Sequence, residues 1–178
     1  INVSDGGFTV DGPDIRFGLN AVKNVGRNLI ATTVQERREM PFRSLYDYCK
    51  RLYGVEINRR AVESLIKAGA FDQLEDTRRG MLESVEGILK SVETDARKNV
   101  AGQLDLFSQL DDEDEWDDYH IPKVPEYPPQ ELLRMEKDVS GLYLSGHPLD
   151  SYREKIEQYA TCQILALSGE SAKEYDGR

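Results

Sequence analysis

The chain has 178 residues and a formal net charge of −10, with 39% hydrophobic and 31% charged residues. No apolar run approaches the ~20 residues that a transmembrane helix needs, so a membrane-spanning protein is excluded. The composition favours a helix-rich protein of one modest domain or two small ones. Cys49 and Cys162 are far apart, so we expect no disulfide and a reducing, cytoplasmic setting. The chain starts at Ile1, not Met, which we interpret as a piece of a longer protein.

The charge is unevenly distributed along the chain. Residues 14–73 carry 11 Lys and Arg against 7 Asp and Glu, a net +4, whereas residues 111–138 carry 3 against 11, a net −8. A basic first part is therefore joined to an acidic connector. This asymmetry permits a nucleic-acid contact in the basic part despite the low pI of 4.8.

The first segment predicts a short β-hairpin over residues 7–18. Phe8 and Val10 alternate with polar residues, and Asp11-Gly12-Pro13-Asp14 supplies turn chemistry. We interpret residues 1–18 as the edge of a preceding domain.

From Leu19 the apolar residues change to helical spacing, with an interruption at Asn24-Val25-Gly26. We expect a short helix, a turn in which Gly26 takes a positive φ, and a second helix. The first N–H groups of that second helix lack intrahelical acceptors. With Lys23 and Arg27 beside them, they form a candidate phosphate site.

A second group of helices follows. Ser44 with Asp47 resembles a capping box, and Asn58 is a candidate cap for a helix whose outer face carries Arg59, Arg60 and Lys67. That helix ends at Ala68-Gly69-Ala70-Phe71, which gives a second helix–Gly turn–helix pattern, with Asp72 placed to cap the next helix.

Two such elements about 40 residues apart predict a mainly α fold, a tandem helix-hairpin-helix domain over residues 19–100. Units of this kind usually bind a duplex backbone without sequence preference. An alternative is that the glycines only end helices and the arginines form a solvated face. The candidate DNA-binding residues are Lys23, Asn24, Val25, Gly26, Arg27, Asn58, Arg59, Arg60, Lys67 and Gly69.

The longest predicted helix runs from Thr77 to Val100. Residues 101–129 then combine the apolar peptide Gln103 to Phe107 with an acidic and proline-rich stretch, which we expect to be a flexible linker. The short apolar peptide is better explained as a plug for a partner's pocket than as a core. We expect further helix over residues 130–160 and the start of another domain over residues 161–178.

Familiar catalytic and metal-binding motifs are missing from the sequence. It has no P-loop, no paired CxxC and no HExxH, and His120 and His147 lack partners at ligand spacing. The acidic run lacks the pattern of an EF-hand. Lys67 and Asp72 lie near a hairpin, as in helix-hairpin-helix lyases, but the rest of that pattern is missing. We therefore predict no catalytic residue, metal site or cofactor in this chain.

Several peptides strongly resemble the bacterial replicative DNA polymerase III alpha subunit, of family C. They occur in the same order and with similar spacing along almost the whole chain. These peptides are Ile15-Arg16-Phe17-Gly18-Leu19, Val22-Lys23-Asn24-Val25-Gly26, Asn58-Arg59-Arg60, Leu65-Ile66-Lys67-Ala68-Gly69-Ala70-Phe71-Asp72, Gly102-Gln103-Leu104-Asp105-Leu106-Phe107, Glu136-Lys137 and Gly141-Leu142-Tyr143-Leu144-Ser145-Gly146-His147-Pro148-Leu149.

The resemblance implies the region after the polymerase fingers. There, a tandem helix-hairpin-helix unit contacts the duplex behind the active site, a peptide binds the beta sliding clamp, and an OB domain follows. The family's clamp peptide corresponds to Gln103, Leu104, Asp105, Leu106 and Phe107. Its catalytic aspartates and their Mg²⁺ belong to the palm, which has no counterpart here. The expected partners are duplex DNA, the clamp and the rest of the holoenzyme, in the bacterial cytoplasm. The rival interpretation is a purely structural connector between polymerase domains.

Overall fold

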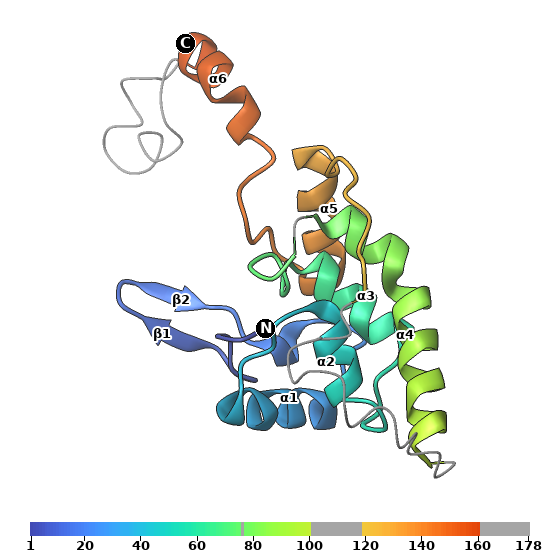
Figure 1. The fold of residues 1–178 in the computed structure, drawn as a ribbon. Coiled ribbons are helices and arrows are strands. Elements are labelled where there is room, and N and C mark those ends of the chain that lie inside the picture. Colours follow the sequence, from blue (N-terminus) through green and yellow to red (C-terminus); the bar gives the residue numbers. More distant parts are fainter. Residues whose placement is uncertain (76, 101–118, 161–178) are drawn as a thin grey trace. The chain divides into compact units, whose positions relative to one another are not determined.

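The computed structural model describes residues 1–75, 77–100 and 119–160 (Figure 1). The chain divides into two compact units, Ile1–Leu144 and a second that begins at Ser145. The described residues of the first unit form one short hairpin and five α-helices. The prediction of a mainly α fold with an N-terminal hairpin is confirmed.

The hairpin pairs β1 (Thr9–Asp11) with β2 (Asp14–Arg16) in antiparallel register, with Val10 opposite Ile15. Gly12 takes a φ of +60° in the turn, a conformation in which a side chain would be strained. The predicted hairpin is therefore confirmed.

Four short elements follow the hairpin: η1 (Leu19–Ala21), α1 (Arg27–Glu39), α2 (Leu45–Arg51) and α3 (Arg59–Lys67). The predicted caps of α2 and α3 are confirmed, because the Ser44 side chain accepts a hydrogen bond from the Asp47 N–H and the Asn58 side chain accepts one from the Ala61 N–H. These bonds satisfy amides that have no acceptor inside their helix.

The core of the first unit is built around Tyr48. Its ring lies 5.0 Å from that of Phe42 and 5.1 Å from that of Phe71, both in edge-to-face geometry. All three side chains are buried. The Tyr48 hydroxyl lies 3.2 Å from the hydroxyl of Thr33 on α1, so the buried polar atom has a partner. These contacts join α1, α2 and the turn after α3 in one core.

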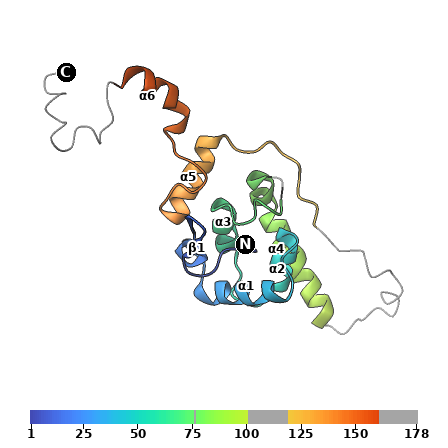
Figure 2. The ribbon, with the colours of Figure 1, turned by 90° about the vertical axis from the view of Figure 1, so that its left-hand side faces the viewer.

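The remaining helices of the first unit are α4 (Arg78–Val100), as predicted, and α5 (Pro129–Ser140). Figure 2 shows α3 in the middle of the unit, between α4 and α5, and residues of α3 contact both helices. The position of α3 is thus fixed from two sides.

Residues 119–128 have no regular secondary structure, and part of this stretch packs against the core. A side chain at Gly80 would meet the Pro122 carbonyl, and one at Gly87 would meet the Tyr119 ring. This part of the expected linker is therefore seated on α4. Residues 101–118, where the rest of the linker was expected, lie outside the described residues.

The second unit is described only over residues 145–160. It holds η2 (Asp150–Tyr152) and α6 (Arg153–Tyr159), which confirms helix in this region. Within the part of the chain that the structure describes, none of the helices has the length and apolar character needed to cross a membrane.

Candidate nucleic-acid interface

The first candidate turn joins η1 to α1. Asn24 adopts the left-handed conformation, with a φ of 65°, whereas Gly26 is extended at φ −70° and ψ 145°. The prediction that Gly26 takes the positive φ is therefore wrong. Asn tolerates this conformation better than most residues, and here its Nδ2 donates to Ser64 Oγ at 3.1 Å. That bond ties the turn to α3.

The start of α1 is open to solvent. Gly26 is the N-cap residue and offers no side-chain hydrogen bond, and Arg27 and Asn28 are exposed. Among the described residues, no acceptor is found for the N–H groups of Arg27 and Asn28, and the Arg27 guanidinium has no ion-pair partner. Free amides and a free guanidinium at a helix start attract anions.

Lys23 anchors the same turn to α5. Its Nζ donates to the Asp138 carbonyl at 2.7 Å, and its backbone N–H donates to the Val139 carbonyl at 2.8 Å. A lysine at the C-terminal end of a helix also complements the helix dipole. Lys23 therefore has a structural role in addition to its exposed charge.

The turn between α2 and α3 is the structural counterpart of the first turn. Gly54 has a φ of +90° and is followed by the half-buried Val55, just as Asn24 is followed by the half-buried Val25. Glu56 has a φ of 48°. The sequence prediction missed this turn, although Gly54-Val55 stands 30 residues after Asn24-Val25 and could have signalled it.

The two turns lie close together in space. A side-chain carbon on Gly26 would sit 3.5 Å from Glu56 Oε2. Gly26 caps α1, and Glu56 stands two residues before Asn58, which caps α3. The starts of two helices, both followed by arginines, therefore share one region of the surface.

The two arginines at the start of α3 differ in whether an ion pair already engages them. Arg59 is exposed but forms ion pairs with Glu63 at 2.6 Å and with Glu86 at 2.8 Å. Arg60 is exposed and has no ion-pair partner within the described ranges. Lys67 ends the same helix, ~12 Å from its start at 1.5 Å per residue. The first turn contacts α3 at Ser64, which lies between Arg60 and Lys67 on that helix.

The backbone amides at Gly69 are not free, unlike those at the start of α1. Gly69 takes a φ of +76° and ends α3, but its N–H donates to the Ile66 carbonyl at 2.9 Å, and the Ala70 N–H donates to the Leu65 carbonyl at 3.0 Å. A side chain at Gly69 would collide with Arg78 and Asp72. The amides at Gly69 are therefore used inside the protein.

Asp72 does not cap the following helix, contrary to the prediction. Its carboxylate accepts hydrogen bonds from the Arg78 guanidinium, at 2.6 and 2.9 Å. The N–H groups of Arg78 and Arg79, which begin α4, instead donate to Glu126. Glu126 lies about 50 residues away in sequence, so local spacing gave no sign of it.

The remaining predicted site residues are Gln103, Leu104, Asp105, Leu106 and Phe107. They lie outside the described residues, so their contribution rests on the sequence.

Known proteins match this chain over most of its length. A family model described as "Helix-hairpin-helix motif" matches residues 1–81, which include both turns. DNA polymerase III subunit alpha of Saccharopolyspora erythraea is 38% identical over 175 residues, 95% of this chain and 15% of the relative. The subunits of Xylella fastidiosa and Escherichia coli are 34% and 35% identical, each over 84% of this chain and 13% of the relative. The chain belongs to the DNA polymerase III alpha-subunit family.

The chain spans only 13–16% of the length of the alpha subunits it matches. The helix-hairpin-helix model ends at residue 81, before the Gln103–Phe107 peptide. The alignment with the Saccharopolyspora erythraea subunit covers 95% of this chain. The paired turns are thus the part of this alpha-subunit segment that both kinds of comparison cover.

Proposed function

We propose that this chain is a non-catalytic part of a bacterial replicative DNA polymerase that binds the duplex backbone without sequence preference and docks on the beta sliding clamp. The parent polymerase would carry out DNA synthesis within the holoenzyme, in the cytoplasm, with Mg²⁺ in its palm. This part would supply processivity by holding both the DNA and the clamp.

The juxtaposition of the two turns carries the DNA-binding proposal. Arg27 and Arg60 follow the starts of α1 and α3, and both guanidinium groups lack ion-pair partners among the described residues. Backbone amides and arginines recognise phosphates, which are common to every sequence. Lys23, Asn24, Val25 and Gly26 shape the first turn, and Asn58 and Arg59 stand at the start of α3. Lys67 adds charge at a distance, and Gly69 supports the fold.

The DNA proposal is tested by titrating the 178-residue chain into a labelled 20-base-pair duplex, followed by fluorescence anisotropy at several salt concentrations. We expect affinity that falls steeply with salt, independent of sequence. Arg27→Glu and Arg60→Glu should each weaken binding to all duplexes. Arg134→Glu is the matched control, because Arg134 is exposed on α5 and has no ion-pair partner within the described residues. If the wild-type chain does not bind duplex DNA at low salt, the DNA-binding proposal is rejected.

The clamp proposal rests on the sequence from Gln103 to Phe107. Phe107 and Leu106 would enter an apolar pocket on the clamp, Leu104 and Asp105 would lie along its surface, and Gln103 would form a hydrogen bond at the rim. A buried aromatic anchor contributes ~2 kcal/mol or more to a small interface. A short peptide also suits exchangeable binding.

A fluorescence titration against the cognate clamp tests this second part. The chain should bind, and Leu106→Ala/Phe107→Ala should lose most of the affinity while α-helical circular dichroism is unchanged. Equal affinity of both proteins for the clamp would reject clamp docking by this peptide.

A purely structural connector is the second candidate function. It is supported by the intramolecular contacts of Lys23 with α5 and of Arg59 with two glutamates. Failure of both titrations would leave this function in place of the first.

A further inference from the structure

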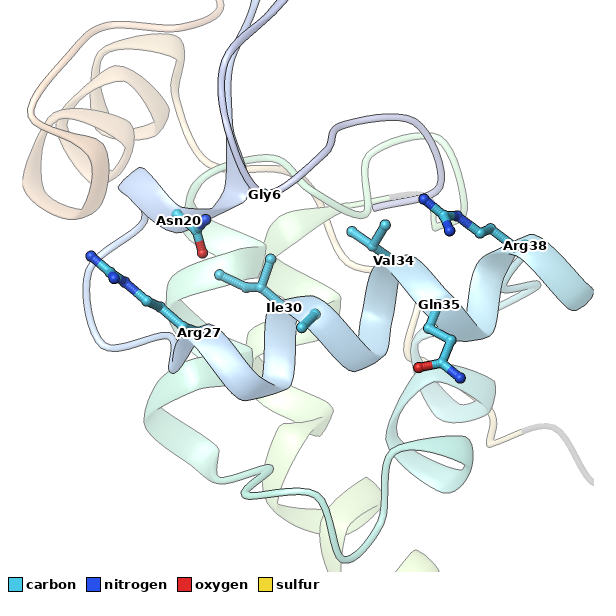
Figure 3. Close-up of a pocket in the computed structure, with 8 residues that line it drawn as sticks. Gly6, Asn20, Arg27, Ile30, Val34, Gln35 and Arg38 are labelled. Carbon is cyan, nitrogen blue, oxygen red and sulfur yellow. The ribbon is translucent and has the colours of Figure 1, made fainter.

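A groove of about 600 Å³ runs along α1 beside the chain segments that hold Gly6 and Asn20. Figure 3 shows Arg27 and Arg38 near opposite ends of the helix, with Ile30 and Val34 between them. A side chain at Gly6 would collide with the Asn20 amide, so this wall of the groove is closely packed. Of the described residues that line the groove, none carries a carboxylate.

The two arginines are unusual in this acidic chain. Most other arginines in the described part form ion pairs, among them Arg37 with Asp5 and Arg51 with Glu36. Arg27 and Arg38 are exposed and have no ion-pair partner among the described residues. Asp5 and Glu36 are already paired with other arginines, so these two carboxylates do not neutralise Arg27 or Arg38. Neither of the arginines at the two ends of the groove is therefore engaged in an ion pair within the described residues.

The spacing of the arginines fits a nucleic-acid backbone. Eleven residues are close to three helical turns, so both side chains leave the same face of α1, ~16 Å apart at their Cα atoms. The major groove of B-DNA is ~12 Å wide. Two guanidinium groups on flexible stems at this separation reach phosphates on both edges of one groove.

We propose that the α1 groove binds the DNA phosphate backbone, and that Arg38 is a DNA-binding residue at its far end. The proposal rests on the proposed duplex binding and extends that interface away from the paired turns. Arg27 belongs to both surfaces, so the path from the first turn along α1 is continuous. The floor at Ala31 and Val34 is small and uncharged, which lets a backbone approach closely.

An acidic peptide is the alternative ligand for the groove, because its carboxylates would also be attracted by Arg27 and Arg38. The continuity with the first turn favours DNA. A peptide would also need pockets for large apolar anchors, but Ile30 is only 3% exposed and the other apolar side chains of the floor, Ala31 and Val34, are small.

The test compares Arg38→Glu with Arg134→Glu in the 178-residue chain, since both variants make the same change in net charge. Duplex binding is measured by anisotropy over a salt series. We expect Arg38→Glu to weaken binding at least ~5-fold at low salt and to reduce the salt slope by about 1. Arg134→Glu should change both quantities much less. Equal effects of the two variants would overturn the role of the groove.

A second variant and a peptide experiment distinguish failure of the groove proposal from failure of the proposed duplex binding. Ala31→Glu places a carboxylate at an exposed position in the groove and should weaken duplex binding as Arg38→Glu does. Unchanged binding of both variants beside a wild type that binds duplex would overturn the groove proposal alone. A wild type that does not bind duplex would overturn the proposed function as well. Poly-glutamate that binds the chain only when Arg38 is intact, beside a duplex affinity that Arg38→Glu leaves unchanged, would assign the groove to an acidic peptide and overturn the proposal.

Discussion

Arg78 Nη1 lies 3.0 Å from Glu136 Oε1, and this ion pair joins the start of α4 to α5 inside the protein. Glu136 is fully buried, and its other oxygen accepts a hydrogen bond from the Leu144 N–H at 2.8 Å. Burial disfavours the charged Arg78, but its hydrogen bonds and charge interactions with Asp72 and Glu136 outweigh this cost and raise its pKa. The network therefore holds α5 against the start of α4 within the first unit.

Removing one member of this network should be costly. Glu136→Ala removes the buried partner of Arg78 on α5 and leaves its pair with Asp72, so we expect the free energy of unfolding to fall by about 2–3 kcal/mol. Urea denaturation of the 178-residue chain measures the change. The double variant Arg78→Met/Glu136→Leu should be more stable than Glu136→Ala, because it also removes the buried guanidinium that has lost one of its partners and fills the space with apolar side chains. A double variant that loses the sum of the two single losses would contradict this account.

Gly69 and Gly54 form a matched pair for a backbone test. Both have a positive φ, but a side chain at Gly54 meets open space, whereas one at Gly69 would collide with Arg78 and Asp72. Gly54→Ala should cost roughly 1–2 kcal/mol from the left-handed backbone alone. Gly69→Ala should cost clearly more, because it also displaces the ion pair. Thermal denaturation monitored by circular dichroism measures both, and equal losses would contradict a structural role for the packing at Gly69.

Glu56 should weaken the proposed DNA contact. Its carboxylate lies beside Gly26 at the start of α1, where a phosphate would bind. Glu56→Gln keeps the shape and removes the repulsion, so we expect duplex affinity at low salt to rise by roughly 2- to 5-fold. Glu131→Gln, an exposed neutralisation on α5, is the control. A similar rise in both variants would point to net charge alone.

Cys49 should make the stability fall at alkaline pH. Burial raises the pKa of its thiol from 9.0 to about 12. Between these values the unfolded chain holds fewer protons than the folded chain, so the free energy of unfolding decreases as pH rises. Burial also raises the pKa of the neighbouring Tyr48, which acts in the same direction.

The measurement compares urea midpoints at about pH 8 and about pH 10.5 in a Cys162→Ser background. Cys49→Ala should lower stability at both values but reduce the fall between them. An identical fall with and without Cys49 would show that other groups govern the alkaline transition.

The local elements of the fold could be predicted because their causes are local. Helical spacing of apolar residues located the helices that follow Ser44 and Asn58, and the caps set their starts. The prediction failed for Gly26 because two residues in one turn, Asn24 and Gly26, could each take the left-handed conformation. The hydrogen bond from Asn24 to Ser64, 40 residues away, is part of a tertiary arrangement that spacing does not reveal.

The candidate site was predicted in part. Residues 23–27 and 58–60 were singled out from glycine, cap and charge patterns, and the structure brings these two groups near each other. The turn at Gly54 was missed because Gly69 stood in a similar pattern. The structure distinguishes the two positions, because a side chain at Gly69 would collide with Arg78 and Asp72, whereas one at Gly54 would meet open space.

The sequence by itself determined the hairpin, the helices and the caps at Ser44 and Asn58, because these follow from local periodicity and residue type, and it determined the family through peptides that match in order and spacing. The tertiary structure decided which turn lies beside the first one, which arginines remain without ion-pair partners, and which carboxylates hold α4. Those outcomes depend on contacts between residues far apart in the chain, such as Arg78 with Glu136. The energies of such contacts come from burial and geometry, which exist only after the chain has folded.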